Sequence, residues 1–155
     1  MRGSEPPQRI LLVANSGGHL LQMLALENAF QGLDRTWVTL AAADSESLLA
    51  DEHVVYAHGP TNRSLKNLLR NLALAWRTVR DSKPDVIVST GAALAVPFFV
   101  VGWLRRKRLV YVESFTRVHH LSLSGRMVYP LADAFFVQWS NNTAPRRALY
   151  AGSVV

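Results

Sequence analysis

The sequence predicts an α/β fold, a Rossmann-like and mostly parallel sheet with helices on both faces. Short apolar runs alternate with segments of helical periodicity along the 155 residues. Runs such as Ile10-Leu11-Leu12-Val13-Ala14 are apolar throughout, as expected of strands that are buried on both faces. Glycine or polar residues follow several runs, at the positions where ligands bind in open α/β sheets.

The first half of the chain supplies three expected strands and two expected helices. Residues 9–14 form the first strand, and a glycine turn leads from it into a helix over residues 18–30. Apolar runs at residues 36–40 and 53–57 are the next two strands, and a short helix over residues 44–50 separates them. These elements follow one another as strand and helix in turn, which favours parallel pairing.

The second half continues the same alternation. The expected elements, in chain order, are a helix over 64–81, a strand over 85–89, a helix over 92–104, a strand over 109–113, a helix over 124–131 and a strand over 134–137. Residues 1–8 are polar and contain proline, and we predict a flexible N-terminus there. Residues 9–155 are expected to form a single domain, because no linker, repeat or low-complexity tract interrupts them.

Composition limits the chemistry. The chain is 49% hydrophobic and 18% charged, which argues against disorder. It contains no cysteine, and its five histidines lack metal-binding spacing, so we expect neither a metal ion nor a cofactor. The net charge of +6 suits an anionic partner such as a nucleic acid, a nucleotide-linked substrate or an acidic membrane surface.

No signal peptide or membrane-spanning segment is visible. The longest apolar stretch, residues 91–104, contains Pro97 and is shorter than the ~20 residues that a spanning helix needs. We therefore expect a cytoplasmic protein, which can still associate with a membrane from one side.

The segment 64–80 has two distinct arcs on a helical wheel. A basic amphipathic helix with a tryptophan can lie in a membrane interface. Alternatively, the leucines pack on the sheet and the basic arc is solvated. The apolar arc contains Leu65, Leu68, Leu69, Leu72, Ala75, Trp76 and Val79, and the basic arc contains Arg63, Lys66, Arg70, Arg77 and Arg80.

A second apolar and basic cluster spans residues 92–108. Its apolar part contains Phe98, Phe99 and Trp103, and its basic part is Arg105-Arg106-Lys107-Arg108. Arginine and lysine beside an apolar surface suit anionic lipid headgroups, so we predict membrane contact here. The alternative is a buried helix whose basic end complements the helix dipole. Nucleic-acid binding is less favoured, because exposed aromatics do not alternate with the basic residues.

Three strand ends are expected to meet in one crevice. Ser16-Gly17-Gly18-His19 follows the first strand, Thr90-Gly91 follows the fourth, and Glu113-Ser114 follows the fifth. The glycine turn can bring backbone N–H groups close to a phosphate, with His19 within reach of the same ligand. The alternative is a tight turn with a packed histidine.

Arg117 stands four residues after Glu113, directly after the fifth strand. A guanidinium is well shaped to bind a diphosphate, and a carboxylate in the same crevice can bind a sugar hydroxyl or orient a histidine. An ion pair between Glu113 and Arg117 that closes the loop is the alternative.

These motifs together resemble one family. The order and spacing are similar to those of PssD/CpsF-type subunits of bacterial exopolysaccharide glycosyltransferases. Those subunits are related to the membrane-anchoring subunit of the eukaryotic transferase that adds the second GlcNAc to dolichyl-diphosphate-GlcNAc. The resemblance covers residues 9–155 and rests on the segments 15–19, 89–92, 96–99, 112–118, 121–126, 129–133 and 137–139.

The resemblance implies the N-terminal half of a GT-B glycosyltransferase, as in MurG. It implies a domain that holds a polyprenyl-diphosphate-linked acceptor, contacts the membrane and recruits a donor-binding partner of the PssE type. His19 would be the general base, and Glu113 would orient it or bind the acceptor. Ser16, Gly17, Gly18, Thr90, Gly91, Ser114 and Arg117 would bind the acceptor or its diphosphate. The relatives' N-terminal anchor has no counterpart in the short polar start of this chain, so we expect peripheral, salt-sensitive association.

The leading hypothesis is therefore a glycosyltransferase subunit, active only with its partner chain, at the cytoplasmic face of the inner membrane. It would transfer sugar from a nucleotide donor, expected to be a UDP-sugar, in capsule or exopolysaccharide synthesis. Two alternatives remain open: a non-catalytic scaffold that anchors a partner transferase, and a stand-alone nucleotide-binding module.

Overall fold

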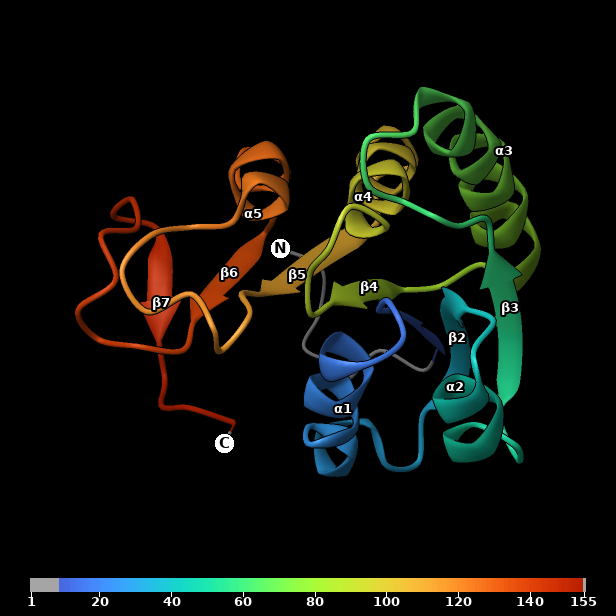
Figure 1. The fold of residues 1–155 in the computed structure, drawn as a ribbon, viewed down its shortest axis with the longest axis horizontal. Coiled ribbons are helices and arrows are strands. Elements are labelled where there is room, and N and C mark those ends of the chain that lie inside the picture. Colours follow the sequence, from blue (N-terminus) through green and yellow to red (C-terminus); the bar gives the residue numbers. More distant parts are fainter. Residues whose placement is uncertain (1–8, 155) are drawn as a thin grey trace.

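The computed structural model describes residues 9–154, which form one seven-stranded sheet around which the helices are arranged (Figure 1). Every pair of neighbouring strands is parallel, in the order β3-β2-β1-β4-β5-β6-β7. The strands are β1 (Arg9–Val13), β2 (Asp34–Leu40), β3 (His53–Ala57), β4 (Val86–Ser89), β5 (Arg108–Val112), β6 (Ala134–Val137) and β7 (Ala148–Tyr150).

Helices cover both faces, as the sequence predicts. In Figure 1, α3, α4 and α5 lie above the sheet and α1 and α2 lie below it. The helices are α1 (Gly18–Leu24), a 3₁₀ turn η1 (Glu27–Phe30), α2 (Ala43–Leu48), α3 (Leu65–Ser82), α4 (Ala95–Leu104) and α5 (Leu123–Val128). The strand order reverses between β1 and β4, and this switch point is where open α/β sheets bind ligands.

The six expected strands are present, and the structure adds details that the pattern did not predict. The helix expected over residues 18–30 is divided into α1 and η1. The β7 strand was missed because it has only three residues, and two of them, Leu149 and Tyr150, are exposed at the sheet edge. The flexible N-terminus predicted for residues 1–8 lies outside the described residues.

The core has two parts, one on each face of the sheet. Leu11 and Val13 of β1 face the α3–α5 side, whereas Ile10 and Leu12 face the α1 side, as the two-residue period of a strand requires. Tyr111 lies at the centre of the first part, stacked on Phe135 at 4.9 Å and edge-on to Phe99 at 5.8 Å between ring centroids.

Burial of Tyr111 leads to a prediction about alkaline stability. Burial, and then the nearby Glu113 carboxylate, raise the pKa of the Tyr111 phenol far above its ordinary value of 10.0. Above pH 10 the unfolded chain therefore loses this proton and the folded chain keeps it. Stability then falls with pH, by up to about 1.4 kcal/mol per pH unit from this group. We expect Tyr111→Phe to remove that part of the decline in urea unfolding measured between pH 8 and 11.

A matched control for this prediction is Tyr150→Phe, since the Tyr150 side chain is exposed rather than buried. Equal slopes of unfolding free energy against pH for wild type and Tyr111→Phe would contradict the prediction.

Helix α3 is rotated about its axis relative to a helix that buries its whole leucine stripe. Leu72, Ala75 and Val79 of the predicted apolar arc pack in the core, but Leu65, Leu69 and Trp76 are exposed. The leucine stripe therefore packs on the sheet along one edge only. Among the described residues, no helix is both long and apolar enough to cross a bilayer.

The predicted membrane contact at residues 98–108 needs a correction. Phe98 and Phe99 have no exposed surface and belong to the core, because α4 lies against the sheet and α3. They cannot contact a membrane in this structure. Trp103 is 57% exposed, and Arg105, Arg106 and Arg108 are exposed, with Lys107 half-buried.

Candidate functional site

The ends of β1, β4 and β5 meet in one place, as the sequence predicts. His19, on the first turn of α1, and Thr90, directly after β4, are joined by two hydrogen bonds. The imidazole Nδ1 lies 2.9 Å from the Thr90 carbonyl oxygen, and the Thr90 hydroxyl donates to the His19 carbonyl at 2.6 Å. Thr90 is fully buried and the imidazole is half-buried, so the histidine is fixed on one side and open on the other.

The contact with Thr90 determines which nitrogen of His19 carries the proton. A carbonyl oxygen only accepts hydrogen bonds, so Nδ1 must be the donor. In the neutral imidazole, Nε2 then has a free lone pair. This is the form that a general base needs, and it is set by the backbone of residue 90.

Gly91 makes room for the imidazole. Its φ of +119° lies in a region that L side chains rarely adopt, and a Cβ there would stand 3.0 Å from His19 Cε1 and 3.2 Å from the Tyr111 hydroxyl. By contrast, a Cβ at Gly17 or Gly18 would meet nothing within 4 Å. The turn with Ser16 is thus open on the side where a ligand would approach, and glycine at residue 91 is required by the histidine itself.

A carboxylate already occupies part of the predicted anion site. The Gly17 N–H donates to Asp44 Oδ2 at 2.6 Å, and Asp44 comes from the first turn of α2. This N–H group is therefore not free for a phosphate, which corrects the interpretation of the glycine turn as an open anion cradle. The contact between Gly17 and Asp44 could not be predicted from their spacing in the sequence.

Gln22 is a second residue that sequence reasoning missed. Its buried amide donates to the Glu113 carbonyl at 3.0 Å and accepts from the Phe115 N–H at 3.1 Å. Gln22 stands three residues after His19 on α1 and so ties the histidine's helix to the end of β5. A buried glutamine on an otherwise apolar helix face is the one signal that the sequence offers.

Glu113 has a structural position rather than the predicted orienting one. Its carboxylate accepts from the Ser114 N–H at 2.9 Å, from the Ser122 N–H at 2.9 Å and from the Ser122 hydroxyl at 3.0 Å. The side chain is 1% exposed. Thr90 rather than Glu113 orients His19, and the prediction that Glu113 does so is wrong, because loop 114–122 surrounds the carboxylate with N–H donors.

Arg117 and Ser114 lie on the loop that Glu113 holds. Arg117 is exposed and forms no ion pair with Glu113 in the structure, which argues against the ion-pair alternative. The Ser114 hydroxyl is paired with that of Thr116 at 2.9 Å. Two hydrogen bonds join the far side of the loop to the chain after β6. The Trp139 indole donates to the Phe115 carbonyl at 2.6 Å, and the Asn142 amide donates to the Arg117 carbonyl at 2.9 Å.

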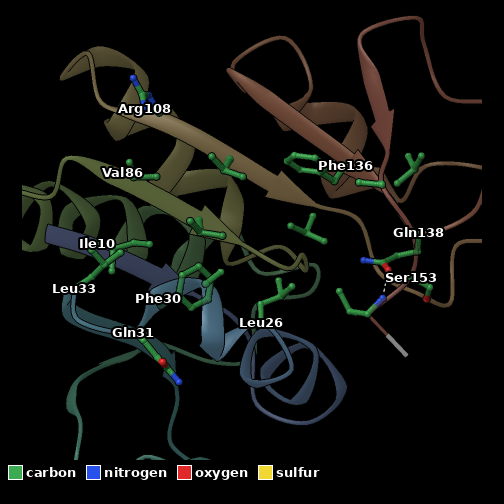
Figure 2. Close-up of a pocket in the computed structure, with 18 residues that line it drawn as sticks. Ile10, Leu26, Phe30, Gln31, Leu33, Val86, Arg108, Phe136, Gln138 and Ser153 are labelled. Atoms are coloured by element: carbon green, nitrogen blue, oxygen red, sulfur yellow. Dashed lines mark hydrogen bonds between the residues drawn. The ribbon is translucent and has the colours of Figure 1, made fainter. Parts of the chain in front are cut away.

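An apolar groove of about 740 Å³ lies elsewhere, on the α1 side of β4, β5 and β6 (Figure 2). Val86, Val88, Val110 and Phe136 form its floor, with Phe30 at one side and residues 151–154 at the other. The tail is held by the Val154 N–H, which donates to Gln138 Oε1 at 2.9 Å. Sequence analysis missed the groove because strands that read as fully apolar were expected to be covered on both faces.

Solved structures identify the fold class. The chain superposes on MurG of Acinetobacter baumannii with a TM-score of 0.78 at 16% identity, covering 95% of this chain and 45% of that one. It also superposes on UDP-GlcNAc 2-epimerase of Neisseria meningitidis, bound to UDP-GlcNAc, with a TM-score of 0.70 at 14% identity, covering 94% and 47%. The chain thus spans about half of each, and its fold is the N-terminal half of a GT-B glycosyltransferase.

Sequence relatives identify the family. Residues 56–154 match the family described as "Oligosaccharide biosynthesis protein Alg14 like", and the chain belongs to this family. It is 32% identical to the UDP-N-acetylglucosamine transferase subunit ALG14 of Eremothecium gossypii over 187 aligned residues, covering 99% of this chain and 83% of the relative. The subunit of the same name from Schizosaccharomyces pombe is 33% identical, with 97% and 85% covered. The predicted class, a glycosyltransferase subunit, is confirmed.

Proposed function

We propose that this chain is the acceptor-binding subunit of a two-chain transferase that moves GlcNAc from UDP-GlcNAc to a polyprenyl-diphosphate-linked acceptor. The observation that carries the proposal is the half-buried His19, whose Nδ1 is held by the Thr90 carbonyl so that Nε2 keeps its lone pair, in a chain of the Alg14-like family. The names of the curated relatives support the donor. The resemblance to PssD/CpsF-type subunits supports an acceptor destined for capsule or exopolysaccharide.

In the proposed reaction, His19 Nε2 accepts the proton of an acceptor hydroxyl. The oxygen of that hydroxyl forms a bond to the anomeric carbon of the donor, and the bond from this carbon to the UDP oxygen breaks. Residues 9–155 would act as a single acceptor-binding domain, with Ser16 and Gly18 facing the acceptor and the buried Gly91 making room for His19. Arg117, exposed on the loop after β5, would bind its diphosphate.

A donor-binding partner of the PssE type completes the enzyme in this proposal. Support comes from the length relation: the chain covers 83% and 85% of relatives named as subunits, but only 45% of MurG. We place the complex peripherally at the cytoplasmic face of the inner membrane, where a lipid-linked acceptor is accessible.

The test is transfer of labelled GlcNAc from UDP-GlcNAc to lipid-linked acceptor in membranes that lack this chain, with the purified chain and its partner added back. We expect label in the lipid fraction only when both chains are present. Transfer of GlcNAc by the partner alone would show that this chain is not required for catalysis. Tight binding of UDP-GlcNAc by the isolated chain, without transfer in the complex, would favour a stand-alone nucleotide-binding module.

A further inference from the structure

Helix α3 buries three polar residues beside its core-facing apolar ones, and it exposes a second set of apolar side chains. Asn67, Asn71 and Thr78 face the interior and are at most 7% exposed. Leu65 is 70% exposed, Leu69 58% and Trp76 45%. At 100° per residue, these three apolar side chains lie within one narrow arc of the outer surface. The exposed ridge is therefore a feature of the whole helix rather than one stray leucine.

Hydrogen bonds to the preceding loop fix this orientation. The Asn71 amide donates to the His58 carbonyl at 2.9 Å and accepts from the His58 N–H at 2.8 Å. The Asn67 amide donates to the Pro60 carbonyl at 2.9 Å. A rotation of α3 that buried Leu65 and Leu69 would break these bonds and leave buried polar groups unpaired. The fold thus fixes the outward orientation of Leu65 and Leu69.

The end of α4 extends the same surface. The Arg105 guanidinium lies 5.2 Å from the centroid of the Trp76 ring, so the turn after α4 lies directly against the exposed ridge of α3. Trp103 is 57% exposed at this end of α4. We call the outer side of α3, with Trp103 and Arg105, the α3–α4 surface.

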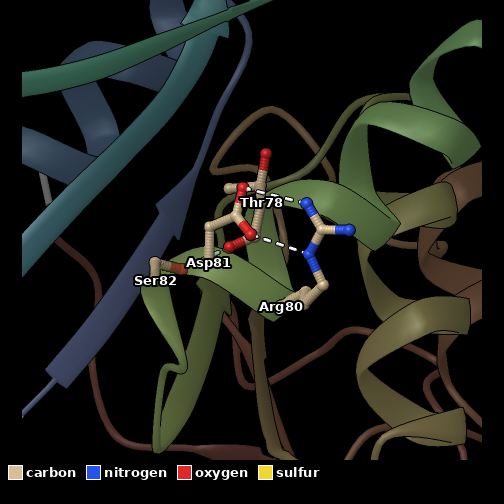
Figure 3. Close-up of polar contacts among 4 residues, drawn as sticks. All are labelled: Thr78, Arg80, Asp81 and Ser82. Atoms are coloured by element: carbon tan, nitrogen blue, oxygen red, sulfur yellow. Dashed lines mark hydrogen bonds and ion pairs between the residues drawn. The ribbon is translucent and has the colours of Figure 1, made fainter.

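Positive charge is concentrated around the α3–α4 surface. Residues 63–108 contain ten of the 17 basic residues of the chain and two of its 11 acidic residues, so the remaining residues have a small negative net charge. Arg80 pairs with Asp81 at 2.7 Å (Figure 3), which lowers the pKa of that carboxyl. Among the α3 cations that the structure describes, Lys66, Arg70 and Arg77 are exposed and form no ion pair.

We propose that the α3–α4 surface inserts into an anionic lipid bilayer. Leu65, Leu69 and Trp76 would enter the boundary between headgroups and acyl chains, with Lys66, Arg70 and Arg77 among the anionic headgroups. The charge of the surface, together with an apolar ridge one helix wide, fits a lipid surface better than a protein groove. The inference goes beyond the proposed function, which needs a membrane but does not specify the contact.

The position of the surface relative to the turn before His19 fits this assignment. The Asn15 amide donates to the Thr61 hydroxyl at 3.2 Å, which joins the turn before His19 to the loop that leads into α3. Leu65 begins the helix four residues later. A bilayer in contact with this end of α3 would therefore lie beside the turn that precedes His19.

The test is flotation of the full chain with vesicles of phosphatidylcholine alone or mixed with phosphatidylglycerol. We expect wild type to float with the anionic vesicles only. The double variant Leu65→Ser/Leu69→Ser should bind them at least about tenfold more weakly, since each leucine loses its apolar burial in lipid. The control is Leu48→Ser on α2, at a leucine that is 46% exposed and outside the surface, and it should bind like wild type.

Three outcomes would overturn the inference. The first is wild-type binding to both vesicle types alike, and the second is unchanged binding by the double variant. In the third, wild type binds neither vesicle type and the double variant no longer co-purifies with the partner, which would make the surface a protein interface.

Heat unfolding like that of wild type verifies that the double variant folds. Transfer to a detergent-dispersed acceptor, expected to be unchanged in this variant, separates failure of this inference from failure of the proposed function.

Discussion

Replacement of His19 with asparagine is expected to lower kcat for GlcNAc transfer by about 10²–10⁴-fold while the complex still assembles. The asparagine amide can donate to the Thr90 carbonyl in place of Nδ1, which is 2.9 Å away in wild type. It has no counterpart of the Nε2 lone pair, however. The variant therefore removes the base and keeps the contact that holds the turn. Transfer rates at saturating acceptor and donor provide the measurement.

His19→Ala is the companion variant, since it removes both the base and the hydrogen bond to Thr90. We expect the same loss in kcat together with a lower melting temperature, because the buried Thr90 carbonyl loses its partner. Transfer by His19→Asn within a few-fold of wild type would refute the role as general base. It would favour the alternative of a scaffold that anchors a catalytic partner.

Replacement of Glu113 with alanine is expected to lower the free energy of unfolding by about 3–5 kcal/mol, a large part of the stability of a domain of this size. The buried carboxylate accepts from two backbone N–H groups, those of Ser114 and Ser122, and from the Ser122 hydroxyl. Alanine leaves these donors unpaired. Urea unfolding followed by circular dichroism measures the effect.

Two further variants distinguish this structural role from a catalytic one. Glu113→Gln keeps one accepting oxygen and should cost less, about 1–3 kcal/mol, whereas Glu46→Gln, at an exposed position of α2, should change stability by less than about 0.5 kcal/mol. Glu113→Ala that unfolds like wild type but fails to transfer GlcNAc would contradict the structural assignment and restore the catalytic one.

The contacts of Gly125 show why the hydrogen-bond network around Glu113 tolerates few substitutions. A Cβ at residue 125 would stand within van der Waals overlap of Glu113 Oε2, and the Gly125 N–H donates to the Ser122 hydroxyl at 2.9 Å to cap α5. The carboxylate, the serine and the first turn of α5 therefore form one unit. This unit positions the loop that carries Arg117.

Much of the fold is predictable because apolar runs and turns are local signals. The strands β1, β4 and β5 could be placed from their residues alone, and parallel order then brings His19 and Thr90 together. The contacts of Asp44 and Glu113 could not be predicted, because their partners are fixed only when separate elements pack. Gly91 reads as a turn glycine, and nothing local indicates that it accommodates an imidazole.

The orientation of α3 illustrates a different limit. Periodicity shows that a helix has an apolar stripe, but not which way that stripe faces. In this chain two asparagines decide it, through hydrogen bonds to His58 and Pro60. Asparagine at residues 67 and 71 was visible in the sequence, four residues apart on one face, as a polar line that flanks the apolar stripe. Only the loop geometry shows that this line is the inner one.

The Asn15–Thr61 hydrogen bond has a consequence for how the protein would meet its substrate. Because it ties the histidine's turn to the loop before α3, a chain bound to a bilayer through α3 would keep His19 at a constant height above the lipid. The acceptor can then stay in the leaflet and arrive by lateral diffusion, with only its sugar and diphosphate leaving the headgroup layer. The quantity that governs encounter is in that case the surface density of acceptor in the leaflet, and the volume of the surrounding solution has little influence on it.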